Sequence, residues 1–275
     1  MLENPHCMLF FTTNHAIILL MKSEERHQAI ISMIPFNGYV MVKDLSETFN
    51  VTEETIRRDL VKICETNNSI KKIHGGVFRT ADDDLGAPQN FRQTLLTKEK
   101  TRFAEVCAAI PSEGDCIMLD SSTTCHFIAQ QLKLKNQKFQ IVTNSLRTAS
   151  LFSDNEYIQV VLVGGRLRKS NGSLVGPEAS RQLEKICADY SFISPTGVDV
   201  QFGITDTNSN EAVVREMMIR NSKKRILVAD HTKFGLTFPN IIAPLDIFDS
   251  IVTDKATSAE FIDEIRSSKL NVVYC

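Results

Sequence analysis

The sequence predicts an α/β protein with a small N-terminal winged helix-turn-helix and a larger domain built on a mostly parallel sheet. Three observations predict this fold class. Residues 40–77 carry two short helical segments around a tight turn, followed by a strand-turn-strand. From residue 97 onward, apolar strand-like runs alternate with helical segments. Residues 82–88 are acidic and rich in helix breakers, and they separate the two patterns as a linker.

The composition is that of an ordinary globular protein, with 43% apolar and 23% charged residues in a chain of 275. The net charge of −2 does not by itself indicate a nucleic-acid partner, although residues 53–80 carry six Lys or Arg against four Asp or Glu. The seven cysteines are scattered and form no C-x-x-C pair. We therefore expect free thiols in a reducing cytoplasm, with neither a disulfide framework nor a metal site, and no cofactor motif occurs.

Residues 1–21 are an unusual start for a globular chain. Their apolar stretches are interrupted at residues 12–15, and no run approaches the roughly 20 residues that a membrane span needs. A secretory signal would need a basic start and a small-residue cleavage site, which this segment lacks. We expect an added N-terminal extension or a translation start at Met21, with a hydrophobic anchor or dimer arm as the alternative.

The N-terminal elements follow from caps and apolar spacing. Ser23 caps a first helix over residues 24–34, whose apolar residues recur at i, i+3 and i+4. Residues 43–49 form a second helix, and Thr52 caps a third. Residues 70–77 form a strand-turn-strand with two glycines at the bend.

The third helix and the hairpin offer candidate contacts to DNA. Ile56, Leu60 and Ile63 form the inward stripe of that helix and leave its polar residues on other faces. A recognition helix touches base edges through its first turns, so the candidates for reading bases are Thr52, Glu53, Thr55 and Arg57. Longer basic side chains bind phosphates, and the candidates for that role are Arg58, Lys71, Lys72 and His74.

Another interpretation of Arg57 and Arg58 is a solvated helix face whose charges pair with Glu53, Glu54 or Asp59. An isolated pair of arginines would favour that interpretation. The preceding capped helix, the turn and the basic hairpin favour the DNA-binding one.

Residues 22–80 closely resemble the N-terminal domain of the DeoR family of bacterial transcription regulators. The matching positions are Glu25-Arg26-His27, Gly38-Tyr39-Val40, Leu45, Phe49, Val51-Thr52, Thr55-Ile56-Arg57-Arg58-Asp59-Leu60 and His74-Gly75-Gly76. The resemblance implies a DNA-binding domain over residues 22–80, with its helix-turn-helix at about residues 40–59. Its implied partner is double-stranded operator DNA.

The larger domain is predicted to consist of strands that alternate with helices. The strands are apolar enough to form a parallel sheet that is covered on both faces. Helices are expected at residues 97–110, 124–134 and 145–152. Strands are expected at residues 114–119, 139–143, 158–163, 190–193, 225–229 and 250–253.

Residues 119–125 carry the strongest chemical signal of this domain, because Asp120 and four hydroxyl residues follow a strand and open a helix. Backbone N–H groups at a helix N-terminus, together with hydroxyls, suit an anion such as phosphate. Further turns follow other strands at residues 143–146, 164–166 and 196–199. In an open α/β sheet such turns gather at the carboxyl edge, where ligands bind.

Residues 98–253 also resemble the C-terminal sensor domain of the DeoR family, which is similar in fold to ribose-phosphate isomerases and CoA transferases. The resemblance implies a phosphorylated sugar or related metabolite as effector. By the same resemblance, Ser121, Ser122, Thr123 and Thr124 would bind phosphate, and Asp120, Asn144 and Asp199 would meet sugar hydroxyls. Lys233 would offer a cation, and Gly164, Gly165 and Glu211 also match the family. Ser122 stands where the family usually has glycine.

The sequence as a whole predicts a cytoplasmic repressor of a sugar-metabolism operon, not an enzyme, that forms homo-oligomers. The alternative is a sugar-phosphate isomerase in which Glu211, Asp230 and Lys233 supply the acid–base groups. The expected organisation is an extension over residues 1–21, a DNA-binding domain over 22–80, a linker over 81–96 and a sensor domain over 97–275.

Overall fold

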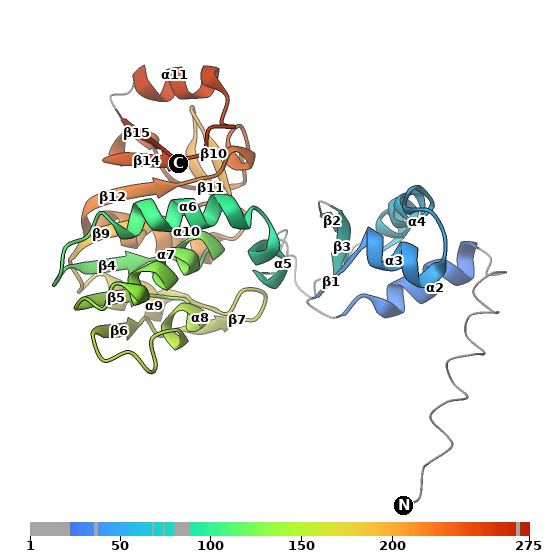
Figure 1. The fold of residues 1–275 in the computed structure, drawn as a ribbon, viewed down its shortest axis with the longest axis horizontal. Coiled ribbons are helices and arrows are strands. Elements are labelled where there is room, and N and C mark those ends of the chain that lie inside the picture. The colour runs from blue at the N-terminus through green and yellow to red at the C-terminus, as the bar shows by residue number, and fades with distance from the viewer. Residues whose placement is uncertain (1–22, 36–37, 68, 74, 80–88, 268–269) are drawn as a thin grey trace, which may run out of the picture. The chain divides into compact units, whose positions relative to one another are not determined.

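The computed structural model describes residues 23–35, 38–67, 69–73, 75–79, 89–267 and 270–275 (Figure 1). The chain divides into two compact units, an N-terminal unit of residues 1–91 and a C-terminal unit of residues 92–275. The predicted extension at 1–21 and residues 81–88 of the predicted linker lie outside the described residues. Among the helices that are described, none is both long and apolar enough to cross a membrane.

The N-terminal unit is a winged helix-turn-helix, as the sequence predicts. Its helices are α2 (Ser23–Met33), α3 (Val42–Phe49) and α4 (Glu53–Thr66), and its strands are β1 (Tyr39–Met41), β2 (Ile70–Ile73) and β3 (Gly76–Arg79). β3 lies between β1 and β2 in an antiparallel sheet. The segment that leads into α3 is therefore a strand, β1, and it completes the wing. A Cβ on Gly76 would lie 2.4 Å from the carbonyl oxygen of Val40, so only glycine permits this close pairing.

The turn between α3 and α4 is fixed by two local devices. Asn50 ends α3 in the left-handed conformation (φ 49°), which asparagine tolerates better than most residues. The Thr52 hydroxyl then accepts the backbone N–H of Thr55 at 3.2 Å and caps α4. The predicted inward stripe of α4 is buried with residues of α2, α3, β2 and β3: Ile30, Leu45, Phe49, Ile56, Leu60, Ile63, Ile70 and Val77.

A buried carboxylate joins α4 to α2. Asp59, 4% exposed, accepts the Nε–H of Arg26 at 2.6 Å and lies 2.9 Å from Nε2 of His27. Burial raises the pKa of Asp59, but the hydrogen bonds and positive charges of Arg26 and His27 outweigh burial and lower it below its usual value. Asp59 therefore serves packing within the unit and is not a partner of Arg57 or Arg58.

The C-terminal unit is built on a seven-stranded sheet in the order β15-β14-β12-β9-β4-β5-β6, and all of its neighbouring pairs are parallel. The strands are β4 (Cys116–Leu119), β5 (Phe139–Thr143), β6 (Ile158–Leu162), β9 (Ala188–Ile193), β12 (Ser222–Val228), β14 (Ser250–Thr253) and β15 (Asn271–Tyr274). Because the strands are parallel, the residues that follow them meet at one edge of the sheet.

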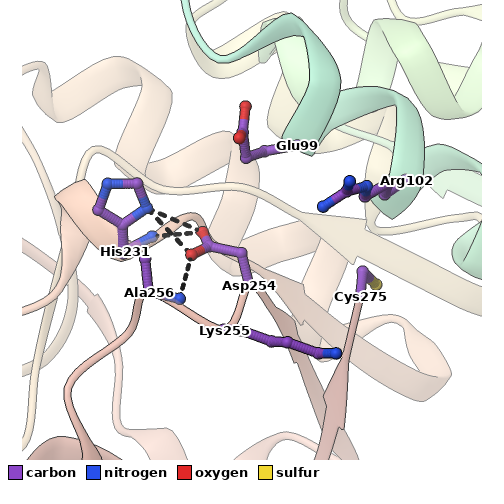
Figure 2. A pocket seen from close by; sticks show the side chains of 7 residues that line it. All are labelled: Glu99, Arg102, His231, Asp254, Lys255, Ala256 and Cys275. Carbon is purple, nitrogen blue, oxygen red and sulfur yellow. Dashed lines mark hydrogen bonds and ion pairs between the residues drawn. The ribbon is translucent and has the colours of Figure 1, made fainter.

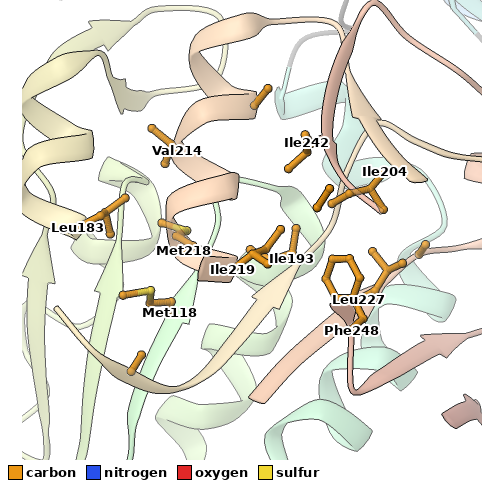
Figure 3. Close-up of a cluster of buried hydrophobic side chains, with 14 of the residues drawn as sticks. Met118, Leu183, Ile193, Ile204, Val214, Met218, Ile219, Leu227, Ile242 and Phe248 are labelled. Atoms are coloured by element: carbon orange, nitrogen blue, oxygen red, sulfur yellow. The ribbon is translucent and has the colours of Figure 1, made fainter. Parts of the chain in front are cut away.

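Helices cover both faces of this sheet (Figure 1). α6 (Thr97–Ala108), α7 (Thr123–Leu134) and the segment of α8 (Leu146–Ser150) bury one face around Phe103, Ile128 and Phe152. α9 (Pro177–Leu183) and α10 (Ser209–Arg220) bury the other, where Leu183 and Met218 pack against strand residues such as Met118 (Figure 3). Two independent apolar layers thus hold the sheet rigid beneath the turns at its edge.

Several elements were not expected from the sequence. They are α5 (Gln89–Thr94) within the predicted linker, the hairpin β7 (Arg166–Arg168) and β8 (Ser173–Val175), and the antiparallel sheet β10 (Gly197–Asp199), β11 (Gly203–Asp206) and β13 (Asn240–Ala243). The other unexpected elements are helices α9, α10 and α11 (Ala259–Ser267), strand β15, and the short turns η1 (His231–Lys233) and η2 (Leu245–Ile247). Most are too short to show a hydrophobic period.

The Asp59 pair yields the first prediction. We expect Asp59→Asn to lower the unfolding free energy of the N-terminal unit by about 2 kcal/mol, because Arg26 loses its buried counter-charge. Urea denaturation followed by hydrogen exchange of the α4 amides measures this. Because the pKa of Asp59 is lowered on folding, its stabilisation is present above an unfolded pKa of about 3.9 and is lost as pH falls through the folded value.

The matched control is Glu54→Gln on the same helix, since Glu54 is an exposed carboxylate that pairs with Arg58. Its loss should cost less than about 0.5 kcal/mol. Equal effects of the two substitutions would contradict the assignment of Asp59 as the structural carboxylate.

Candidate functional site

The start of α4 presents an exposed polar face. The hydroxyls of Thr52 and Thr55 lie 2.9 Å apart at the helix N-terminus. Arg57 donates to Glu53 at 2.6 Å, and Arg58 donates to Glu54 at 3.3 Å. Both arginine side chains remain more than half exposed, at 55% and 78%.

These ion pairs match the solvated-face interpretation of the two arginines, but they do not exclude DNA. Exposed i,i+4 pairs contribute only about 0.3–0.5 kcal/mol, so a phosphate or a base edge can replace the carboxylate at little cost.

The wing adds a second basic element next to α4. A groove of about 230 Å³ lies between them and is lined by Arg57, Val61, Lys72 and Gly75, among others. Lys72 is exposed and Lys71 is half-buried on the same strand, β2. The groove brings Arg57 and Lys72 together, whereas His74 lies outside the described residues.

In the C-terminal unit, the turn from β4 to α7 is built by its own side chains. Asp120, 1% exposed, accepts the N–H of Ser122 at 2.9 Å, and the Ser122 hydroxyl caps α7 by accepting the N–H of Cys125 at 3.1 Å. Ser122 has φ −69°, so its position does not require the glycine usual there. Thr123 and Thr124 open the helix, and their N–H groups have no acceptor within it.

A buried arginine neutralises this turn. Arg215 of α10 donates to Asp120 at 2.8 Å and also pairs with Asp206 at the end of β11. Burial lowers the pKa of Arg215, but Asp206, Asp120 and Glu211 outweigh burial and raise it. Asp120 also accepts the N–H of Ser194 at 2.9 Å, which ties the ends of β4 and β9 together.

Glu211, one turn before Arg215 on α10, is fully occupied by hydrogen bonds. It accepts from Ser121 at 2.9 Å, and from Arg168, Asn171 and Ser173 of the β7–β8 segment at 3.2, 2.7 and 2.5 Å. Burial raises the pKa of Glu211, but Arg215, Arg168 and these donors reverse the effect and lower it to about 2. Glu211 thus fixes the Ser121 hydroxyl and is an ineffective proton acceptor at neutral pH.

Asn144 follows β5 beside Asp120, and its side-chain oxygen lacks a hydrogen-bond donor. Its Nδ2 donates to the carbonyl of Leu174 at 3.3 Å, but none of the described residues donates to its buried Oδ1. Asn144 is 0% exposed, so solvent does not compensate. A buried amide oxygen without a donor is costly and is suited to a ligand hydroxyl.

Lys233 enters from η1. Its Nζ donates to the hydroxyl of Ser194 at 2.6 Å, and burial lowers its pKa, against the opposing charge of Asp230. Asp254, at the end of β14, anchors the same turn because it accepts the N–H of His231 at 2.8 Å and lies 3.0 Å from its Nδ1 (Figure 2). This pair lines a pocket of about 350 Å³ beside α6, together with Glu99, Arg102, Lys255, Ala256 and Cys275.

Three other predicted effector residues have structural partners. Asp199 accepts the N–H groups of Gln201 and Phe202 and the hydroxyl of Thr237, all within or next to the small antiparallel sheet. Gly164 donates to Gln182 at 3.0 Å. Gly165 has φ +146°, and a Cβ there would lie 2.7 Å from the carbonyl of Val175. Their roles as ligand contacts stay predictions.

The sequence analysis did not identify five charged residues of this site. They are Arg92, Lys100, Arg168, Asp206 and Arg215. Lys100 is 5% exposed, and burial together with the charge of Lys233 lowers its pKa to about 8. The one available signal was the spacing of Glu211 and Arg215, which places them on one face of a helix.

Comparison with known protein families matches both units. Residues 26–81 match the DeoR-like helix-turn-helix domain, and residues 96–255 match the DeoR C terminal sensor domain. The second match alone covers more than half of the chain.

Similar proteins include the HTH-type transcriptional regulator YulB of Bacillus subtilis, 33% identical over 90% of this chain and 95% of that protein. The glycerol-3-phosphate regulon repressor of Escherichia coli is 28% identical over 93% of this chain and 100% of its own. The repressor GlcR of Bacillus subtilis is 30% identical over 88% and 93%. A ribose 5-phosphate isomerase from Methanocaldococcus jannaschii overlaps 49% of this chain and 53% of its own, at 14% identity and a TM-score of 0.37.

The Arg215 network yields the second prediction. We expect Arg215→Met to lower the unfolding free energy of the C-terminal unit by about 3–5 kcal/mol, because Asp120 and Asp206 stay buried without their counter-charge. Thermal unfolding of the full chain by calorimetry measures this. Arg220→Met, at the exposed end of the same helix, is the control and should change stability by less than about 0.5 kcal/mol. Similar melting temperatures for the two variants would contradict the network.

Proposed function

This chain belongs to the DeoR family of transcriptional regulators, and from that membership we propose that it is a repressor of a sugar-metabolism operon. We propose further that its affinity for operator DNA changes when a phosphorylated sugar or related metabolite binds in the C-terminal unit. One relative is named for the regulon of a phosphorylated three-carbon metabolite, glycerol 3-phosphate, which is consistent with this ligand class.

DNA binding is assigned to α4 and the wing. Thr52, Glu53, Thr55 and Arg57 at the exposed start of α4 are proposed to meet base edges. Arg58, Lys71, Lys72 and His74 are proposed to bind phosphates, and the groove that joins Arg57 to Lys72 supports a shared surface. One such module offers few base contacts, so we propose that the protein acts as a homo-oligomer that reads paired half-sites.

The observation that carries the effector proposal is the chemistry at the sheet edge. The first N–H groups of α7, the hydroxyls of residues 122–124 and the ammonium of Lys233 suit a phosphate, whereas the hydroxyl of Ser121 is donated to Glu211. The buried, unpaired Oδ1 of Asn144 suits a hydroxyl donor. A phosphorylated sugar supplies both groups, whereas inorganic phosphate supplies no carbon-bound hydroxyl.

The isomerase alternative is disfavoured by the state of its proposed base. A pKa of about 2 for Glu211 leaves it a weak proton acceptor, and four donors already occupy its oxygens. Coupling to DNA is instead a linkage effect. A ligand that favours one arrangement of the protein shifts the DNA equilibrium by its difference in affinity for the two arrangements.

The third prediction concerns DNA. In a mobility-shift assay with the protein's own promoter, Arg57→Ala should weaken binding by about 1–3 kcal/mol and relax sequence preference, because it removes a base contact. Arg58→Ala should weaken binding to all sequences and reduce the salt dependence by about one phosphate contact.

Arg181→Ala is the matched control, since Arg181 is an exposed arginine of α9 that pairs with Glu178, three residues before it on the same helix. It should leave DNA affinity unchanged. Wild-type affinity in both α4 variants would overturn the DNA-binding surface.

The fourth prediction concerns the effector. A thermal-shift screen of sugar phosphates should identify a stabilising ligand, and Asn144→Ala should reduce the shift. Because Lys100 has a pKa of about 8 and is cationic below it, affinity for an anion should fall as pH rises through 8. At pH 8 the bound anion should raise that pKa, so binding should take up a fraction of a proton, up to about one half.

Calorimetry in buffers of different ionisation enthalpy measures this proton uptake. Lys100→Gln should abolish the uptake. Binding that is independent of pH between 7 and 9 in the wild-type protein would contradict a role for Lys100.

A further inference from the structure

Helix α5 joins the two units within six residues of chain. Phe91, the last residue of the N-terminal unit, is 1% exposed, and its ring lies 4.7 Å from that of Tyr39 on β1. Arg92, the next residue, opens the C-terminal unit. Arg92 is therefore a residue of the unit that carries the proposed effector site.

The guanidinium of Arg92 lies among the charges of the effector site. It is attracted by Asp206, Glu211 and Asp120 and repelled by Arg215. None of the described residues accepts a hydrogen bond from its buried Nε. A buried cationic donor without an acceptor is unfavourable in the ligand-free protein.

The neighbouring carboxylates are already committed to other donors. Asp120 binds Arg215 and the N–H groups of Ser122 and Ser194. Asp206 binds Arg215, the hydroxyl of Thr196 at 2.9 Å and the N–H of Asn208 at 2.9 Å. Glu211 holds the four donors described above. The guanidinium of Arg92 thus lies close to three carboxylates, and each carboxylate already accepts hydrogen bonds from other residues.

Lys100 ties the backbone of this helix to the site. Its Nζ donates to the carbonyl of Arg92 and, at 2.7 Å, to that of Leu95 at the end of α5. The charges of Lys233 and Asp230 also act on Lys100. The position of α5 is therefore coupled to the same cations that suit a phosphate.

We propose that Arg92 binds the anionic group of the effector directly, and that this contact holds α5 in the effector site. The proposal rests on the proposed function, since it assumes an anionic effector at this site. A phosphate oxygen supplies the acceptor that Nε lacks and adds a charge-assisted hydrogen bond. The bound anion then holds α5 from its side chain, as Lys100 holds it from its backbone.

The test uses the full-length protein with glycerol 3-phosphate and inorganic phosphate as probes in calorimetric titrations. Arg92→Gln should weaken the binding of the phosphate-containing probes about tenfold or more, because it removes the charge and shortens the reach. Arg181→Gln, at an exposed arginine of α9 that pairs with Glu178, is the matched control and should bind like the wild type.

A purely structural role of Arg92 would have a different consequence for the melting temperature of the ligand-free protein. If Arg92 served packing alone, Arg92→Gln would lower the melting temperature of the ligand-free chain. Because Nε of the wild-type guanidinium lacks an acceptor, we expect the melting temperature of the ligand-free variant to be unchanged or higher, with a smaller ligand-induced increase.

Hydrogen exchange of the peptide that covers residues 89–95 tests whether the bound anion holds α5. The probe should slow exchange of this peptide in the wild type and in Arg181→Gln but not in Arg92→Gln. Wild-type affinity of Arg92→Gln for a probe that does bind would overturn this inference and leave the proposed function intact. If the wild type binds neither these probes nor any sugar phosphate of the thermal-shift panel, the proposed function fails, and this inference fails with it.

Discussion

Arg215 lies between the carboxylates of Asp120 and Asp206, and all three residues are at least 96% buried. They come from α10, from the turn after β4 and from the end of β11, so one guanidinium fixes three elements. Without it, two buried carboxylates would lack their counter-charge. Because Asp120 is held, it can in turn hold the N–H groups of Ser122 and Ser194, which shape the sheet edge.

The pairing of these carboxylates also determines which groups of the site remain available to a ligand. Each carboxylate is saturated by donors of the protein itself, so none is available to pair with Arg92. Among the residues that the structure describes, the site groups without a hydrogen-bond partner include a cationic donor, Nε of Arg92, and a neutral acceptor, Oδ1 of Asn144. These two groups fit the proposed ligand, which is both anionic and hydroxylated.

The N-terminal unit uses the same contrast between buried and exposed pairs. Arg26 and Arg57 each bind a carboxylate at 2.6 Å. The carboxylate of Asp59 is buried, so its pair holds α2 to α4, whereas that of Glu53 is exposed and its pair is easily exchanged. Burial of the partner, rather than distance, separates the structural arginine, Arg26, from Arg57, which is proposed to contact DNA.

The sequence by itself determined the fold class, the family resemblance, the capped start of α4 and the polar turn after β4. Caps, apolar periods and strand-ending turns depend on residues within a few positions of one another, so they can be read locally. Helix α10, with a polar and mixed sequence, and helix α5, within the predicted linker, gave no such period.

Only the tertiary structure decided which charges meet. Asp120 and Arg215 are 95 positions apart, and Asp59 and Arg26 are 33 apart, so no local pattern relates them. The role of an arginine depends on whether the carboxylates near it are buried and already hydrogen-bonded to other residues. Both properties arise only when the chain is packed.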